Sequence, residues 1–389
     1  MNLNAHLSEL PAAEAAAFRT LVARLQAAPQ REPSPQLASR ILAAVASERT
    51  RNPKPETRNP KPETRNPKPG TRNPPPWQWA AALAAALLAA VTLFNRPAAP
   101  LPAAPLPANP AADPAAWLAA CQEADGAWQP ARHGGDPAYR PALTALAALA
   151  LARDPADRFR EGVRRATDAL VALQTADGAF GGEGRVRAYN QAIAAYALAT
   201  LAPHGPATAA ALERAVAFSR AGQSAEGGWD YEAGSEGNTA VTAWQVRALA
   251  AAAERGVGQA NIPLRKGLRW LRGAARSEGG VAYHRGSAGR SESLSALAAY
   301  TLMTSGRSFE GLPALGRNLT AALSAADGAA DCYRDYAKVM AFESAGDTAR
   351  AEAVRTGMRH RRQAGAQDPW EPIGGTLYTC AFTALAARQ

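Results

Sequence analysis

The residues that could do acid–base chemistry are few and scattered along this 389-residue chain. Asp331 and Asp335 lie four residues apart, so a helix would place both carboxylates on one face, where paired acids can exchange protons. Arg334 and Lys338 adjoin them, which favours an ion cluster at the surface or at a cavity rim. No P-loop, dinucleotide or G-x-S-x-G motif is present. No metal-ligand spacing connects the histidines, which are His6, His133, His204, His284 and His360.

Aromatic, amide and guanidinium side chains indicate a binding cavity instead. They follow the glycine turns or lie on Ala/Leu-rich segments, and a wall of this composition suits a lipid, a glycan or a peptide. The candidate lining residues are Tyr189, Asn190, Gln191, Trp229, Tyr231, Asn238, Trp244, Gln245, Tyr283, His284, Arg290, Tyr333, Tyr336 and Trp370. Alternatively, the aromatics at the turns only brace neighbouring helices. These turn aromatics are Trp128, Phe180, Trp229 and Trp370.

An internal repeat positions these residues. A turn signal recurs every 49 to 52 residues, at Gly126, Gly178, Gly227, Gly279 and Gly328, and a degenerate copy ends at Trp370. A glutamine precedes four of the copies, at Gln122, Gln174, Gln223 and Gln363. In the clearest copy, 226–253, Asn238 or Thr239 caps a helix. Periods of this length are typical of helical hairpins that stack or close into a ring.

Each period contains two helical segments. The predicted helices are 113–122, 141–153, 158–174, 187–202, 207–222, 238–254, 262–275, 290–304, 313–325, 331–345, 347–363 and 375–388. Small-residue segments such as 190–193 and 293–297 suit a closely packed inner ring, whereas charged segments such as 158–161 and 352–362 suit an outer ring facing water. Six pairs favour closure into an all-α (α/α)6 toroid. Closure would make Cys121 and Cys380 neighbours, as a disulfide or as two buried thiols.

Residues 113–389 resemble the α/α toroid of the terpenoid cyclase and protein prenyltransferase superfamily. The Gln-x3-Gly-x-Trp turns are similar to the QW motifs of squalene–hopene cyclases. The stretches GGWDYEAGSEGNTAVTAWQVRAL, DCYRDYAKVMAFESAGD and GGTLYTCAFTALAA resemble bacterial prenyltransferase/squalene-oxidase-repeat proteins. The resemblance implies the toroid fold, which by itself does not define a function.

The catalytic groups that the resemblance would imply are not matched. Hopene-type cyclases use an Asp-x-Asp-Asp acid, but the chain has no Asp-Asp pair, and Asn238 stands where related repeat proteins tend to have Asp. Protein prenyltransferases hold zinc with Asp-x-Cys and a later His. Here Asp331 and Cys332 are adjacent, and Tyr378 occupies the His position. We therefore expect no metal and no cofactor, with Asp331 as a helix cap and Cys332 as a small buried residue.

Three segments precede the toroid. Residues 1–49 form a predicted helical tail that resembles the N-terminal segment of bacterial anti-sigma factors without the zinc-binding His-x3-Cys-x2-Cys. Residues 50–76 repeat the heptapeptide Thr-Arg-Asn-Pro-Lys-Pro-Glu, which predicts an extended, solvated linker. Residues 77–94, WQWAAALAAALLAAVTLF, carry no charge, and at ~1.5 Å per residue they span ~27 Å, enough for a bilayer core. A buried soluble helix is the alternative. Residues 95–112 are a Pro/Ala-rich spacer.

Charge predicts the orientation of that span. Residues 1–76 carry 12 Lys and Arg against 6 Asp and Glu, whereas residues 95–389 carry 31 against 27. The positive-inside tendency therefore predicts a single-pass protein of the bacterial inner membrane, with a cytoplasmic N-terminus and the toroid on the extracytoplasmic side. The net charge of +10 follows from this topology and not from nucleic-acid binding, because no aromatics are interleaved with the basic repeats.

Three functions remain open at this point. The first is a membrane-anchored, non-catalytic toroid that binds a ligand or a partner protein. The second is an enzyme of the terpene cyclase or prenyltransferase type acting on isoprenoid lipids. The third is a transmembrane regulator whose tail, 1–49, holds a cytoplasmic protein such as a sigma factor.

Overall fold

The computed structural model describes residues 110, 112–203, 205–277, 279–325 and 328–387. The predictions for the tail 1–49, the linker 50–76 and the span 77–94 lie outside these residues. The described residues form twelve α-helices, three short 3-10 helices and no β-strand beyond two isolated bridges. All twelve predicted helices are therefore confirmed, with ends that differ by a few residues.

The α-helices are α5 (Pro114–Ala120), α6 (Arg140–Leu151), α7 (Arg160–Leu173), α8 (Gly184–Leu201), α9 (Pro206–Ala221), α10 (Thr239–Glu254), α11 (Asn261–Ala274), α12 (Glu292–Thr304), α13 (Leu312–Ala321), α14 (Cys332–Ser344), α15 (Thr348–Gln363) and α16 (Glu371–Ala386). The 3-10 helices are η1 (Pro130–His133), η2 (Pro137–Tyr139) and η3 (Gly258–Ala260). Asn238 caps α10 through its side-chain oxygen, which accepts a hydrogen bond from the Val241 N–H at 2.9 Å. Asp331 caps α14 in the same way, as predicted.

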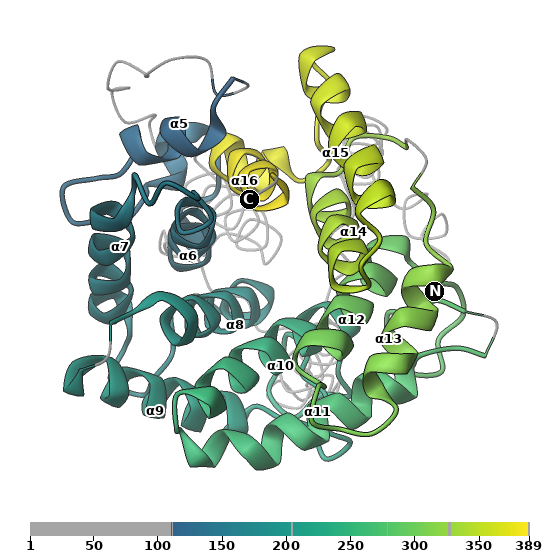
Figure 1. The fold of residues 1–389 in the computed structure, drawn as a ribbon. Helices are drawn as coiled ribbons and strands as arrows, with labels where there is room; N and C mark the ends of the chain where they lie inside the picture. Colours follow the sequence, from purple (N-terminus) through teal and green to yellow (C-terminus); the bar gives the residue numbers. More distant parts are fainter. Residues whose placement is uncertain (1–109, 111, 204, 278, 326–327, 388–389) are drawn as a thin grey trace, which may run out of the picture. The chain divides into compact units, whose positions relative to one another are not determined.

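The helices α6, α8, α10, α12, α14 and α16 form an inner ring in which each packs on the next and α16 packs on α6 (Figure 1). The other six lie outside this ring and pack against it. The inner helix α6 buries almost every residue, whereas the outer helix α7 buries four. Small alanine side chains let the inner helices approach closely, and charged residues occupy the water-facing side of the outer ones. The predicted all-α toroid is thus confirmed, as is the division into small-residue inner and charged outer segments.

The recurring glutamines connect one repeat to the next. Three of the four, Gln122, Gln174 and Gln223, each donate amide hydrogens to two carbonyls, one of the glycine in the same turn and one in the following outer helix. The acceptors are Gly126 and Gly162 for Gln122, Gly178 and Ala211 for Gln174, and Gly227 and Pro263 for Gln223, at 2.8 to 3.2 Å. Each bond contributes about 1 kcal/mol net. The Gln-x3-Gly spacing therefore sets the distance between neighbouring hairpins.

Three of the turn aromatics brace the helices. Trp128, Phe180 and Trp229 are buried. The indole N–H of Trp128 donates to the Leu118 carbonyl at 2.8 Å, and that of Trp229 donates to the Ser219 carbonyl at 2.6 Å. The bracing interpretation is confirmed for these three residues. It is wrong for the fourth, Trp370, whose side chain is 43 % exposed.

The ring closes where the first and last repeats meet. Gly135 and Gly374 form an isolated antiparallel bridge, and the Asp136 N–H donates to the Ile373 carbonyl at 2.7 Å. Helix α16 kinks there, because Gly375 has φ 63° and ψ −168°. The kink also explains why α16 begins before residue 375, the start that the sequence predicts.

The two cysteines predicted to meet at closure lie on neighbouring elements. Cys121 directly follows α5, which packs on α16, the helix that carries Cys380. Both are buried free thiols, the second of the two predicted alternatives. Burial raises the pKa of Cys121 to about 12, and the neighbouring Cys380 adds to the effect. The Cys121 thiol is therefore protonated at neutral pH and a poor nucleophile.

Candidate binding cavity

A cavity of about 140 Å³ lies among the inner helices. Its walls come from α6, α8, α10, α14 and α16, together with η2 and the loop that precedes α10. The lining residues are Tyr139, Ala142, Leu143, Leu146, Arg185, Tyr189, Ile193, Tyr231, Trp244, Tyr333, Trp370, Ile373, Gly374, Tyr378 and Phe382. Most of this wall is aromatic or aliphatic, so the cavity suits an apolar group.

Helical spacing presents these side chains to one space. On α8, Arg185, Tyr189 and Ile193 follow one another at intervals of four residues, and therefore share a face. On α16, Tyr378 and Phe382 have the same spacing, and Gly374 lies just before the kink at Gly375. Because both helices belong to the inner ring, these two faces line the cavity together.

Aromatic contacts at Phe382 form the deep end of the wall. Its ring meets those of Tyr333 and Tyr378 edge to face, with centroids 5.3 and 4.7 Å apart. The indole N–H of Trp244 donates to the Tyr333 hydroxyl at 3.2 Å, which joins α10 to α14 across the ring. Edge-to-face pairs and this hydrogen bond hold the aromatic side chains in defined orientations.

At the other end of the cavity the tyrosine hydroxyls meet. The Tyr231 and Tyr283 hydroxyl oxygens are 2.7 Å apart, and the Tyr189 ring lies 6.3 Å from that of Tyr231. Burial raises the pKa of Tyr189 well above its usual value, and the neighbouring tyrosines raise it further. Tyr189 is therefore neutral at physiological pH and able to donate a hydrogen bond. The exposed Arg185 and the exposed Trp370 complete this end.

The titratable side chains of this wall are tyrosines and Arg185 alone among the described residues. None is a carboxylate, an imidazole or a thiol, the groups that most often transfer protons near neutral pH. The wall can therefore bind through van der Waals contact, ring faces and hydroxyl hydrogen bonds.

Five of the fourteen residues predicted from the sequence line this cavity: Tyr189, Tyr231, Trp244, Tyr333 and Trp370. Tyr283 and His284 lie beside it, since Tyr283 contacts Tyr231 and stacks edge to face on His284 at 4.6 Å. The His284 ring nitrogen is 2.9 Å from the Gly237 carbonyl oxygen. Both residues therefore support the loops around the cavity.

The other predicted residues have different partners. Asn190 accepts from the Ala142 N–H and donates to the Ala138 carbonyl, and Gln191 donates to the Ala215 carbonyl. Trp229 braces a turn, Asn238 caps α10 and Gln245 is buried. Arg290 lines a separate hollow with Glu292. Tyr336 contacts Arg247, deeper in the ring. These seven are absent from the cavity lining because the helices, turns and caps that carry them direct their side chains toward other neighbours.

The sequence prediction missed several lining residues. Tyr378 and Phe382 have a clear helical spacing in GGTLYTCAFTALAA, which could have identified them. Tyr139 lies in a 3-10 helix of three residues, so no periodic pattern marks it. Arg185 stands in the first turn of a helix that begins earlier than its apolar pattern.

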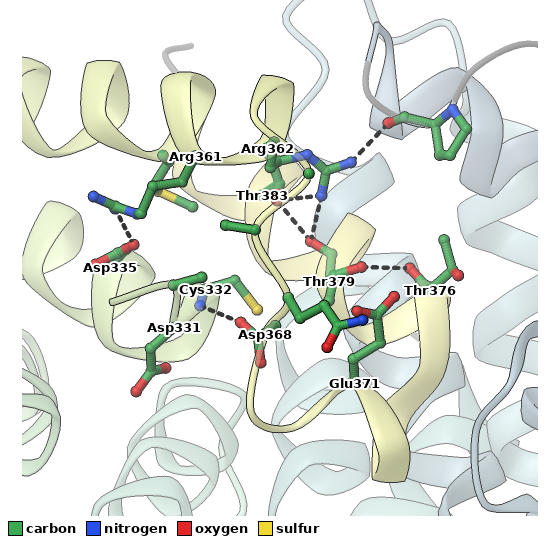
Figure 2. A pocket seen from close by; sticks show the side chains of 16 residues that line it. Asp331, Cys332, Asp335, Arg361, Arg362, Asp368, Glu371, Thr376, Thr379 and Thr383 are labelled. Carbon is green, nitrogen blue, oxygen red and sulfur yellow. Dashed lines mark hydrogen bonds and ion pairs between the residues drawn. The ribbon is translucent and has the colours of Figure 1, made fainter. Parts of the chain in front are cut away.

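The paired aspartates lie outside this cavity, beside a hollow of about 310 Å³ between α14, α15 and α16 (Figure 2). Asp335 accepts from Arg334 at 2.9 Å and from Arg361 at 2.6 Å, which confirms the predicted ion cluster. Burial raises the pKa of Asp331. Cys332, as predicted, is buried, and its backbone N–H donates to Asp368 at 2.6 Å. Within the described ranges, no group of His, Cys, Asp and Glu is arranged to hold a metal ion.

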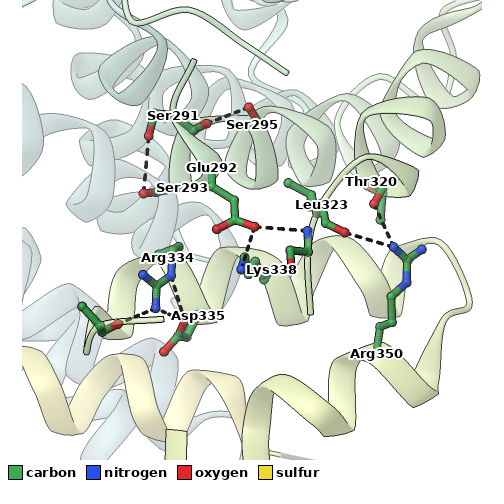
Figure 3. A network of polar contacts seen from close by, with 12 residues as sticks. Ser291, Glu292, Ser293, Ser295, Thr320, Leu323, Arg334, Asp335, Lys338 and Arg350 are labelled. Carbon is green, nitrogen blue, oxygen red and sulfur yellow. Dashed lines mark hydrogen bonds and ion pairs between the residues drawn. The ribbon is translucent and has the colours of Figure 1, made fainter. Parts of the chain in front are cut away.

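The fourth member of the predicted cluster, Lys338, has another partner. Its ammonium lies 2.8 Å from the Glu292 carboxylate, which also accepts from the Ser324 N–H at 3.1 Å (Figure 3). Nearby, Arg350 donates to the Leu323 carbonyl at 3.2 Å. This network therefore ties α12, α14 and α15 to the segment that follows α13, and its charged groups are engaged in packing.

None of the helices described here is long and apolar enough to cross a membrane. Residues 77–94, for which the sequence predicts such a helix, lie outside the described part of the chain.

Comparison with known proteins agrees with the helical ring. Residues 89–296, more than half of the chain, match the family model of the prenyltransferase alpha-alpha toroid domain. The match begins within the predicted span and ends in the first turns of α12. No curated protein matches the sequence.

Proposed function

The chain belongs to the prenyltransferase alpha-alpha toroid family, and from this premise we propose that its ring is a non-catalytic binding module. The ligand that we propose is a lipid, such as an isoprenoid, whose apolar end enters the cavity. This proposal rests on the size and composition of the cavity, and the positive charges near the cavity support it.

The size favours one end of a ligand over a whole folded polyene. An apolar cavity of about 150 Å³ holds a single benzene-sized molecule. The cavity in this ring measures about 140 Å³, so it has room for a group such as one prenyl unit. Cyclisation of a squalene-like chain requires that the whole chain be enclosed, for which this volume is too small.

The charge around the cavity also counts against cyclisation. A cyclase stabilises carbocations, which requires electron-rich walls and no fixed positive charge nearby. Here the guanidinium of Arg247 lies 4.4 Å from the ring of Trp244, a wall residue, and Arg185 lies at the opposite end. Both cations would repel a carbocation, whereas a neutral prenyl group is unaffected.

Filling the cavity tests the proposal. We expect the full-length protein to bind prenol, geraniol and farnesol, and Ala142→Phe to weaken that binding about tenfold or more, which corresponds to ~1.4 kcal/mol. Ala142 is buried in the wall, so a phenyl group there occupies the space that the prenyl group needs. Isothermal titration calorimetry measures the affinities.

The control is Ala210→Phe, which adds the same group on the exposed side of α9 and should leave binding unchanged. Equal binding by the Ala142 and Ala210 variants would show that the ligand lies elsewhere. Turnover of squalene or of a prenyl diphosphate by the full-length protein would refute the non-catalytic part of the proposal.

We also propose that residues 77–94 anchor the protein in a membrane with the ring on the extracytoplasmic side. The support is the uncharged sequence, with Trp77 and Trp79 at its start, and the basic segment before it. After cell lysis and an alkaline carbonate wash, the full-length protein should stay with the membranes, and a variant lacking 77–94 should be released. Release of both would refute the anchor. The binding role of the tail 1–49 stays a prediction.

A further inference from the structure

Arg247 is a buried cation in the middle of the ring. It lies on α10, one turn beyond Trp244, and the residue is only 3 % exposed. The guanidinium carbon lies 4.3 Å from the ring centre of Tyr196, 4.4 Å from that of Trp244 and 4.7 Å from that of Tyr300. Three aromatic side chains from three inner helices thus enclose it.

The N–H donors at the edge of this guanidinium do not all have hydrogen-bond partners. Nη2 donates to the Tyr336 hydroxyl at 3.2 Å, but Nη1 has no hydrogen-bond partner among the described residues. No carboxylate of the described chain forms an ion pair with it, although the other deeply buried arginine, Arg355, pairs with Glu343. Ring faces stabilise a guanidinium by cation–π attraction, whereas a buried donor without a hydrogen-bond partner destabilises the folded state. The three rings therefore stabilise the faces of the cation, but they provide no hydrogen-bond acceptor for Nη1.

This cation lies in a different layer from the apolar cavity. Arg247, Tyr336 and Tyr196 follow the cavity residues Trp244, Tyr333 and Ile193 by three residues each, which is ~4.5 Å further along the helices. The hydrogen bond between Trp244 and Tyr333 separates the two layers.

Nη1 itself is buried, and the two tyrosine side chains beside Arg247 are what reaches solvent. Tyr196 and Tyr300 are only partly buried, although both rings contact the guanidinium. Since the inner helices all run from the cavity toward this layer, the access is from the end of the ring where these helices finish.

We propose that Arg247 anchors a second site, which binds a small oxyanion group, a carboxylate or a phosphate, at its Nη1 edge. A guanidinium offers N–H donors in a planar fork that matches the oxygens of such anions. The hydroxyls of Tyr196 and Tyr300 lie on the same side chains that cage the cation and can donate to the anion. A bound anion would supply the charge that the described chain does not provide. The site is independent of the prenyl-binding cavity.

Calorimetric titration of the full-length protein with inorganic phosphate and with acetate, at constant ionic strength, tests this site. Saturable binding of one of them is expected, and which one binds identifies the oxyanion. Arg247→Met should abolish it while the protein stays folded, because replacing a buried charge with an apolar side chain of similar volume is often neutral or stabilising. Arg220→Met, at an exposed position of α9, removes the same charge and should bind like the unmodified protein.

Arg247→Lys provides a second variant in case the methionine variant does not fold. It keeps the charge and loses the fork, so binding should weaken about tenfold, or ~1.4 kcal/mol. Ala142→Phe, which fills the other cavity, should bind the anion normally. Absence of saturable binding, or equal binding by the unmodified protein and both Arg247 variants, would mean an adventitious ion only and would overturn the proposal.

A spectroscopic readout locates the anion. The positive charge of Arg247 lowers the pKa of the Tyr196 hydroxyl below its usual value. An anion bound beside Arg247 should raise that pKa again, which ultraviolet absorbance of tyrosinate follows during alkaline titration. Tyr196→Phe should remove this part of the titration. A titration that is unchanged by a saturating anion would place the anion elsewhere and contradict the proposal.

Discussion

Gly375→Ala is expected to destabilise the protein by about 3 kcal/mol or more, because the seam of the ring cannot accommodate the new methyl group. Gly375 adopts φ 63° and ψ −168°, a conformation that is essentially restricted to glycine. A Cβ atom there would overlap the carbonyl oxygen of His133 and the backbone nitrogen of Gly135. Both belong to the first repeat, so the clash falls where the ring closes.

Urea unfolding of the two proteins measures this effect. The control is Gly346→Ala, because Gly346 also has a positive φ, 80°, but nothing lies within 4 Å of a Cβ built on it. This control should cost only about 1 kcal/mol, the conformational part alone. Equal losses for the two variants would mean that contact at the seam does not contribute to the stability of the ring.

Phe382→Ala is expected to cost about 3–5 kcal/mol of folding free energy and to change which ligand binds best. Phe382 is 1 % exposed and contacts the rings of Tyr333, Tyr336 and Tyr378. Its removal merges a phenyl-sized space with the cavity of about 140 Å³. The affinity for geraniol relative to that for prenol should therefore rise, as measured by calorimetry.

Phe342→Ala is the matched control for this change. Phe342 is fully buried on α14, but its ring packs against Arg350 at 4.4 Å, and it is not part of the cavity wall. It should lose a similar free energy of unfolding and leave the ligand preference unchanged. An identical shift in both variants would contradict the position that we assign to the prenyl group.

The sequence predicted the helical hairpins because their signals are local. A glutamine four residues before a turn glycine recurs in three repeats, and each such glutamine makes the same two hydrogen bonds. Small residues on α8 and charged residues on α7 likewise indicated which helix lies inside. These patterns depend on contacts within one repeat or between adjacent repeats, which a fixed period reproduces.

The aromatic residue that follows a turn has different surroundings in different repeats. Trp229 and Trp370 both follow a turn in the sequence, yet Trp229 is buried against Ser219 and Trp370 lies at the edge of the cavity. The last repeat differs because it packs on the first one across the seam, where α16 kinks at Gly375. No pattern within the last repeat reveals that contact.

The sequence by itself thus determined an all-helical ring of paired helices, since propensity, capping and repeat spacing act over short stretches of chain. Only the tertiary structure decided which side chains share the cavity and which stand beside Arg247. Tyr196, Tyr300 and Tyr336 reach that cation from three different helices, and the first and last of them are 140 residues apart in the chain. Such contacts between distant side chains depend on how far each helix is rotated about its axis when the ring closes. This rotation results from the packing of all the hairpins together.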